Sequence, residues 1–126
     1  MALSYDSDLT ERVIGLAIEV HRHLGPGLLE SVYEACLAFE LHKAGVDHRR
    51  QVPLPIVYKE VRLECGYRLD LLIREQLVIE IKSAERILPI HEAQILTYLC
   101  LGGYQVALLM NFNTVMLKDG LRRFVL

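Results

Sequence analysis

The sequence predicts an α/β fold in which helices cover both faces of a central mixed sheet. Two helical segments come first, three or four short strands follow, and a third helix precedes two final strands. The central strands are apolar on both faces, which indicates a sheet covered on both sides. With 126 residues and 52% hydrophobic content, the chain can bury a substantial core, so we expect a single domain over residues 1–126.

The first two helices are expected to flank a Gly-Pro-Gly turn at 25–27. Ser7 or Asp8 can cap the first helix, whose apolar residues recur at helical spacing as far as the turn. The second helix is predicted over residues 28–43. It is expected to close at Gly45, because glycine suits the left-handed position that ends many helices.

Strands are predicted to follow over residues 46–63. Pro53 and Pro55 favour an edge strand or an irregular strand there, because proline cannot donate a hydrogen bond to a neighbouring strand. The later elements are expected to be a helix over 89–101 and strands over 104–110 and 120–126.

Between these segments, a hairpin is predicted around a three-residue loop at 74–76. Such a loop pairs Ile73 with Leu77 and places Asp70 directly opposite Glu80. Alternate residues of a strand point to opposite faces. The predicted faces are Asp70, Leu72, Val78, Glu80 and Lys82 on one side and Leu69, Leu71, Ile73, Leu77, Ile79 and Ile81 on the other.

Asp70, Glu80 and Lys82 are charged residues in an otherwise apolar hairpin. Uncompensated charges in such a place cost roughly several kcal/mol each, and a bound cation is one way to compensate them. Mg²⁺ is typically held by one or two carboxylates, while a nearby lysine can position or deprotonate a water molecule. The alternative is a structural network of two acids and a lysine, and the spacing alone does not decide between the two.

Glu30, Gln94 and Tyr98 are further candidates. Glu30 lies in the first turn of a predicted helix, where the helix dipole favours an acid, but it could also join a metal site. Gln94 and Tyr98 are one helical turn apart and could reach the charged site together. Alternatively, Tyr98 buries its ring with the hydroxyl at the rim while Gln94 is exposed.

The composition restricts the classes of function. A net charge of −2 provides no general attraction to nucleic acid, so any such binding needs a local patch. No glycine-rich phosphate loop precedes a helix, which argues against nucleotide-cofactor chemistry.

Cysteine usage and hydropathy predict the location of the protein. Cys36, Cys65 and Cys100 are odd in number and far apart, so we expect buried, reduced thiols of a cytoplasmic protein. The first residues lack the pattern of a secretory signal, and no apolar run approaches the ~20 residues that span a bilayer, so no membrane association is expected.

Several ordered blocks resemble one known family. Residues 27–33, Gly-Leu-Leu-Glu-Ser-Val-Tyr, are similar to the signature of the GxxExxY family, a branch of the PD-(D/E)XK nuclease superfamily. The similarity extends over nearly the whole chain. Other blocks that resemble the family are 19–27, 67–70, 80–82, 91–98, 111–113 and 118–120.

The resemblance implies a restriction-endonuclease-like α/β sandwich and assigns roles in it. Asp70 and Glu80 would be the metal-binding acids, aided by the backbone carbonyl of Ile81, and Lys82 would be the catalytic lysine. Glu30 would add an acid from a helix that precedes the sheet.

In the same resemblance, Gln94 and Tyr98 are similar to a Gln-x-x-x-Tyr motif that supports the active site and contacts substrate. Leu69 replaces the proline of the superfamily's name. The implied activity is a nuclease that uses Mg²⁺ or Mn²⁺ on nucleic acid, with DNA favoured over RNA, and its products would carry 5′-phosphate and 3′-hydroxyl ends. The alternative is a catalytically silent binding or assembly module on the same scaffold. A homodimer would help either one.

Overall fold

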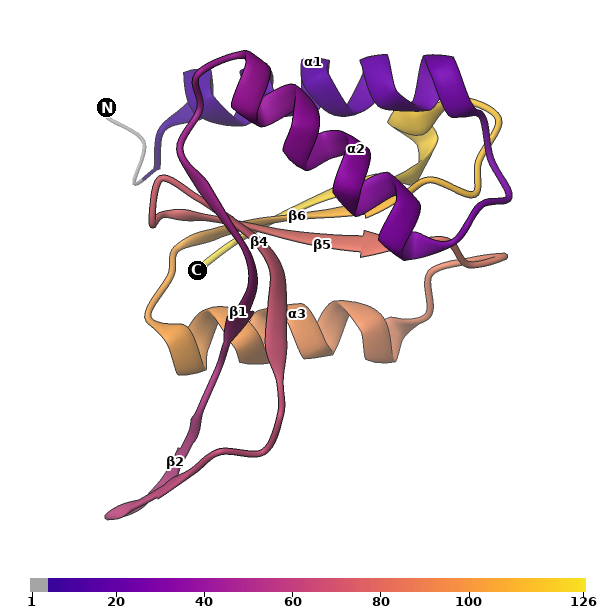
Figure 1. Cartoon of the computed structure of the whole chain (residues 1–126). Coiled ribbons are helices and arrows are strands. Elements are labelled where there is room, and N and C mark those ends of the chain that lie inside the picture. The colour runs from indigo at the N-terminus through magenta and orange to yellow at the C-terminus, as the bar shows by residue number, and fades with distance from the viewer. Residues whose placement is uncertain (1–4) are drawn as a thin grey trace.

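The computed structural model describes residues 5–126 and contains a five-stranded mixed sheet between two layers of helices. Figure 1 shows α1 and α2 on one face of the sheet and α3 on the other. The helices are α1 (Ser7–Leu24), α2 (Glu30–Lys43), α3 (Pro89–Gly102) and a short 3₁₀ helix, η1 (Leu117–Gly120). The strands are β1 (His48–Pro53), β2 (Ile56–Tyr58), β3 (Val61–Leu63), β4 (Arg68–Ile73), β5 (Leu77–Lys82), β6 (Val106–Asn111) and β7 (Leu121–Val125).

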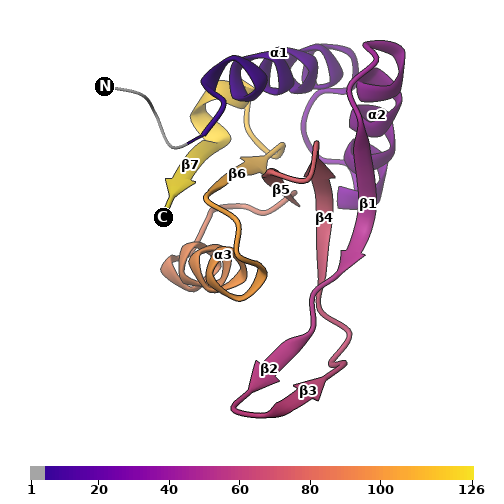
Figure 2. The same ribbon diagram turned by 90° about the vertical axis from the view of Figure 1, so that its left-hand side faces the viewer.

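The strand order of the main sheet is β1-β4-β5-β6-β7. Strands β5 and β6 are parallel and are joined through α3, while the other neighbouring pairs are antiparallel. Strands β2 and β3 form a separate two-stranded hairpin that projects from the body of the molecule (Figure 2). This architecture confirms the restriction-endonuclease-like α/β sandwich expected from the sequence.

The sheet has an apolar core on each face. The α1 and α2 side contains, among others, Val13, Ala17, Tyr33, Leu37, Leu71, Ile79, Leu108 and Phe112. The α3 side contains, among others, Leu72, Val78, Ile95, Leu99, Ala107 and Leu109. Burial on both faces explains why β5 and β6 read as almost continuous apolar runs in the sequence.

The helix ends differ slightly from their predicted positions. Asp6, rather than Ser7 or Asp8, caps α1, and its carboxylate accepts a hydrogen bond from the Leu9 backbone N–H at 3.0 Å. Helix α2 begins at Glu30 instead of residue 28, because Leu29 is in an extended conformation. It closes before Gly45, which adopts the expected left-handed conformation at φ 71°.

The central hairpin has the predicted loop. Ile73 pairs with Leu77, and the backbone ladder between β4 and β5 continues only to Leu71 and Ile79. Beyond that point β4 pairs with β1 alone, and the two strands run together toward the β2–β3 hairpin (Figure 2). The predicted face of Leu69 is therefore wrong. Leu69 packs in the core on the α3 side, whereas Leu71 packs in the core on the α1 and α2 side.

Two further expectations concern the edge of the sheet and the cysteines. Strand β1 is an edge strand and ends at Pro53, as predicted. The expectation of buried thiols is wrong for Cys65 and Cys100, which are exposed, whereas Cys36 is half-buried. Cys65 lies in the loop before β4, and Cys100 lies on the outer side of α3, away from the sheet. No helix within residues 5–126 combines the length and hydropathy needed to cross a bilayer.

Candidate active site

Asp70 and Glu80 lie side by side where the ladder between β4 and β5 stops. The Asp70 backbone N–H donates to Glu80 Oε1 at 3.4 Å, and the Ile81 N–H donates to Asp70 Oδ2 at 2.8 Å. Side-chain oxygens therefore accept the bonds that backbone carbonyls would accept in a regular ladder. This exchange holds both carboxylates against the backbone of the neighbouring strand.

Burial and mutual repulsion disfavour the charged forms of both acids. Only 7% of Glu80 is exposed, and burial, followed by the charge of Asp70, raises its pKa to about 8. Burial also raises the pKa of Asp70, and the charges of Glu34 and Glu30 act in the same direction. The bond from Ile81 opposes that shift. The positive charge near Asp70 and Glu80 is thus too small to offset the effects of burial and repulsion on their pKa values.

Lys82 lies close enough to lower the pKa of Glu80 but does not neutralise the acids by contact. Within residues 5–126, no ion pair of 4.0 Å or less joins Lys82 to Asp70 or Glu80. The closed structural network of two acids and a lysine, which the sequence left as an alternative, is therefore not formed. Among the described residues, Lys82 is unpaired beside the half-buried carboxylate of Asp70 and the buried carboxylate of Glu80.

Glu30 lies at the rim of the same site, in the first turn of α2. Its Oε2 accepts a hydrogen bond from the Ser83 backbone N–H at 3.3 Å, and Ser83 Oγ donates to the Leu28 carbonyl at 2.6 Å. These bonds attach the start of α2 to the residue that follows Lys82. A cavity of about 410 Å³ lies between α2 and the strands β1, β4 and β5. It is lined by Glu30, Ser31, Glu34, Gln51, Asp70 and Ile81.

Gln94 and Tyr98 contact each other on α3. The Gln94 amide donates to the Tyr98 hydroxyl at 3.0 Å, with Tyr98 buried and Gln94 exposed. Burial raises the pKa of Tyr98, and the charge of Glu80 acts in the same direction. The buried ring of Tyr98 and the exposed Gln94 agree with the structural alternative, and a role of the pair at the charged site stays a prediction.

Glu34, Arg50 and Gln51 belong to this region, although the sequence analysis did not select them. Glu34 is only 6% exposed, accepts hydrogen bonds from Arg50 Nε at 3.1 Å and Gln51 Nε2 at 2.6 Å, and pairs with the Arg50 guanidinium. The sequence does contain a signal that could have identified Glu34. It follows Glu30 by four residues, which puts both acids on one face of the helix.

Asn111 fixes the segment that follows Lys82. Its Oδ1 accepts from the Ala84 N–H at 3.0 Å, and its Nδ2 donates to the Ala84 carbonyl at 3.0 Å. Asn111 is buried at the end of β6, next to the end of β5. The paired bonds hold the chain in place immediately beyond the candidate lysine.

The donor atoms of the site suit a hard divalent cation. No cluster of three or more His, Cys, Asp and Glu side chains arranged to hold a metal ion occurs in the described part of the chain. Mg²⁺, however, is commonly held by one or two carboxylates, with water and substrate oxygens completing its shell. Asp70 and Glu80 supply two carboxylates that lack a cation partner, so the residues present fit such an ion.

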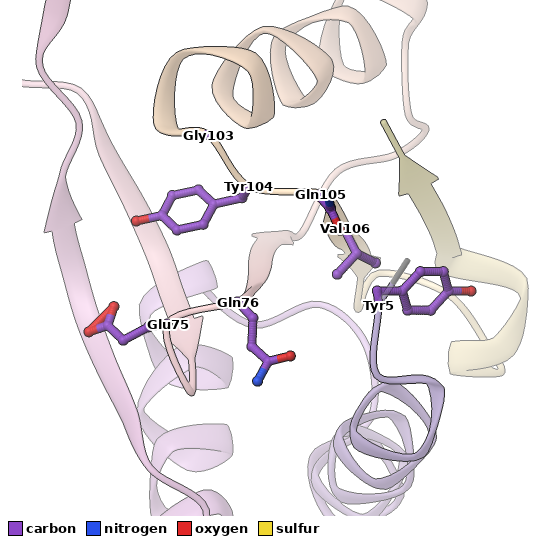
Figure 3. Close-up of a pocket in the computed structure, with 7 residues that line it drawn as sticks. All are labelled: Tyr5, Glu75, Gln76, Gly103, Tyr104, Gln105 and Val106. Carbon is purple, nitrogen blue, oxygen red and sulfur yellow. The ribbon is translucent and has the colours of Figure 1, made fainter. Parts of the chain in front are cut away.

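A separate cavity of about 250 Å³ lies at the opposite end of β5 (Figure 3). It is lined by Tyr5, Glu75, Gln76, Gly103, Tyr104, Gln105 and Val106. Its one acid, Glu75, pairs with Arg49 at 2.6 Å, so this cavity does not share the unpaired carboxylates of the site.

The fold and the site define a class of protein. An α/β sandwich whose central hairpin carries Asp70, and then Glu80 and Lys82 two residues apart, has the arrangement typical of restriction-endonuclease-like nucleases. The family model of the PD-(D/E)XK nuclease superfamily matches residues 7–124, and the chain belongs to this superfamily. No curated protein and no solved structure matches the chain.

Proposed function

We propose that the protein is a divalent-metal-dependent nuclease of the GxxExxY branch that hydrolyses phosphodiester bonds of nucleic acid, with DNA as the favoured substrate. The observation that carries this proposal is the adjacent pair of the half-buried Asp70 and the buried Glu80, which have no ion-pair partner within residues 5–126 although Lys82 is near. Membership in the nuclease superfamily supports the same conclusion.

In this proposal, Asp70 and Glu80 hold Mg²⁺ or Mn²⁺ together with the backbone carbonyl of Ile81. Glu30 contributes through a water molecule or a second ion. When bound, the ion lowers the pKa of water and balances negative charge on the phosphodiester. The protein residues bring these oxygens together at the end of β5.

Lys82 orients the attacking water as an ammonium group, or accepts the proton of that water as a neutral amine, and within residues 5–126 it is not held in an ion pair with the acids. Gln94 and Tyr98 support the site from α3, and their mutual hydrogen bond orients the Tyr98 hydroxyl. The Gln94 side chain is exposed and so is free to contact a bound strand.

The proposal is tested by cleavage of DNA and RNA substrates with Mg²⁺ or Mn²⁺, comparing wild type with Lys82→Ala. Loss of a group that transfers a proton typically lowers the rate roughly 10²- to 10⁴-fold, and we expect a loss in this range. Lys118→Ala is the matched control, since Lys118 is exposed on η1. Wild type and Lys82→Ala that are both folded and equally inert on every substrate would contradict the enzyme proposal.

The second candidate is a catalytically silent binding or assembly module. It is favoured by the net charge of −2 and by the lack of a three-acid metal cluster within residues 5–126. Titration with Mn²⁺ separates the two candidates. A nuclease should bind Mn²⁺, and Asp70→Asn should abolish that binding, whereas in a silent module Asp70→Asn should change stability alone.

A further inference from the structure

Gln51 occupies an unusual position opposite Asp70. It lies between the β1–β4 pairs Arg50 with Leu71 and Val52 with Leu69. Its φ of 51° is in the left-handed region, which residues other than glycine adopt infrequently and at a cost. Such a conformation persists only where surrounding contacts stabilise it.

Those contacts connect Gln51 to two other elements, α2 and β4. Its carbonyl accepts from Arg68 Nη1 at 3.0 Å, which supports the left-handed backbone. Its side-chain amide donates to Glu34 Oε1 on α2 at 2.6 Å and to Asp70 Oδ1 on β4 at 3.4 Å. Because both acceptors are carboxylate oxygens, the amide nitrogen must face them, which settles its orientation.

Glu34 is the fixed end of this connection. It is buried and is held by Arg50, so its position does not depend on Gln51 alone. The Gln51 amide therefore bridges an anchored carboxylate and a carboxylate of the candidate site.

The effect falls on Asp70, whose two oxygens are held from different directions. Oδ2 accepts from the Ile81 backbone N–H at 2.8 Å, and Oδ1 accepts from Gln51. A carboxylate held at both oxygens cannot rotate freely. Hydrogen bonds of this kind orient metal-binding carboxylates, and their loss typically costs about 10- to 100-fold in metal affinity or activity.

We propose that Gln51 is a positioning residue: the Glu34–Gln51–Asp70 relay holds the Asp70 carboxylate in the orientation that binds a divalent cation. This inference rests on the proposed function, since it concerns the same carboxylate. It adds that a residue without direct contact to the ion sets the affinity of the site.

The test is Gln51→Met, which keeps the approximate size of the side chain and removes the amide donor. We expect Mn²⁺ affinity, measured by calorimetry, to fall about 10-fold or more. The Mn²⁺ concentration for half-maximal cleavage should rise in parallel, while the rate at saturating Mn²⁺ stays within about 3-fold of wild type. Arg49→Met is the matched control, because the neighbouring Arg49 binds the distant Glu75. A folded Gln51→Met with wild-type Mn²⁺ affinity overturns the proposal.

A second variant separates the side chain from the backbone. Gln51→Gly also removes the amide but suits the left-handed conformation, so it should stay folded and lose affinity to the same degree. Gln51→Gly with unchanged affinity overturns the proposal even if Gln51→Met fails to fold.

Crystals of the ion-free proteins distinguish this inference from the proposed function. If the wild-type protein binds no Mn²⁺, the proposed function is contradicted. The relay is then tested by the orientation of the Asp70 carboxylate in these crystals. A rotated Asp70 carboxylate in Gln51→Gly supports the relay, and an unchanged carboxylate overturns it.

Discussion

At the scale of single residues, the chemistry of the site depends on where charge is left unbalanced. Glu34 has Arg50 as a partner, and Glu75 has Arg49. Within residues 5–126, Asp70 and Glu80 have hydrogen bonds from the backbone and from Gln51 but no ion pair. Two adjacent carboxylates, one buried and one half-buried, destabilise an ion-free protein, and the same feature favours cation binding.

Glu80 provides a prediction for stability against pH. Its pKa is raised from 4.5 to about 8, so the folded protein holds a proton in this window that the unfolded chain releases. The contribution of Glu80 to the free energy of unfolding should therefore be greatest below about pH 4.5. It should fall as pH rises toward 8, by on the order of 1 kcal/mol per unit.

Urea unfolding in the presence of a chelator, at several values between pH 5 and pH 8, measures this slope. Glu80→Gln cannot ionise and should flatten it. An equal slope in wild type and Glu80→Gln would show that another group accounts for the pH dependence.

At the scale of elements, the sequence predicts those features that depend on neighbours along the chain. The hairpin loop at 74–76, the edge position of β1 and the glycine that closes α2 follow from local chemistry. The course of β4 before Leu71 does not, because that part of the strand pairs with β1 and not with β5. That is why the predicted face of Leu69 is wrong and the contact of Gln51 with Asp70 was missed.

Tyr33 shows how one side chain holds two elements together. Its hydroxyl donates to the Gly25 carbonyl at 2.6 Å and accepts from the Leu28 N–H at 3.1 Å, and its ring stacks on Phe112 at 4.4 Å. The α1–α2 turn is thereby fixed, and with it the Leu28 carbonyl that binds Ser83. The tyrosine of the signature motif thus has a structural role beside the site.

Tyr33→Phe should lower the free energy of unfolding by about 1–3 kcal/mol, because it leaves a backbone donor and acceptor without their partner. Urea unfolding at constant pH measures the change. Tyr58→Phe, on the exposed β2–β3 hairpin, should stay within about 0.5 kcal/mol of wild type. A Tyr33→Phe protein as stable as Tyr58→Phe would contradict the structural role.

At the scale of the whole molecule, the candidate site joins parts that are distant in the sequence. Glu30 comes from α2, Asp70 and Glu80 from the central hairpin, and Tyr98 from α3 on the other face of the sheet. Asp70 and Glu80 lie together near the end of β5, Glu30 binds Ser83 just beyond it, and Asn111 of β6 fixes Ala84. The participation of Tyr98 stays a prediction. The homodimer, the cytoplasmic location and the single domain over residues 1–126 stay predictions.

Ion binding should stabilise the whole fold. A ligand that binds only the folded state at 100 times its dissociation constant contributes about 2.7 kcal/mol. We therefore expect saturating Mn²⁺ to raise the midpoint of thermal unfolding by several degrees in wild type. The same Mn²⁺ concentration should leave Asp70→Asn unchanged, and an equal shift in both proteins would indicate binding elsewhere.

The most direct measurement is the anomalous diffraction of a crystal soaked in Mn²⁺. The proposal predicts a peak within coordinating distance of carboxylate oxygens of both Asp70 and Glu80, with the Lys82 ammonium group outside ion-pair distance of either acid. A crystal without a peak, in which Lys82 instead forms an ion pair with both acids, would contradict the proposed metal-dependent nuclease.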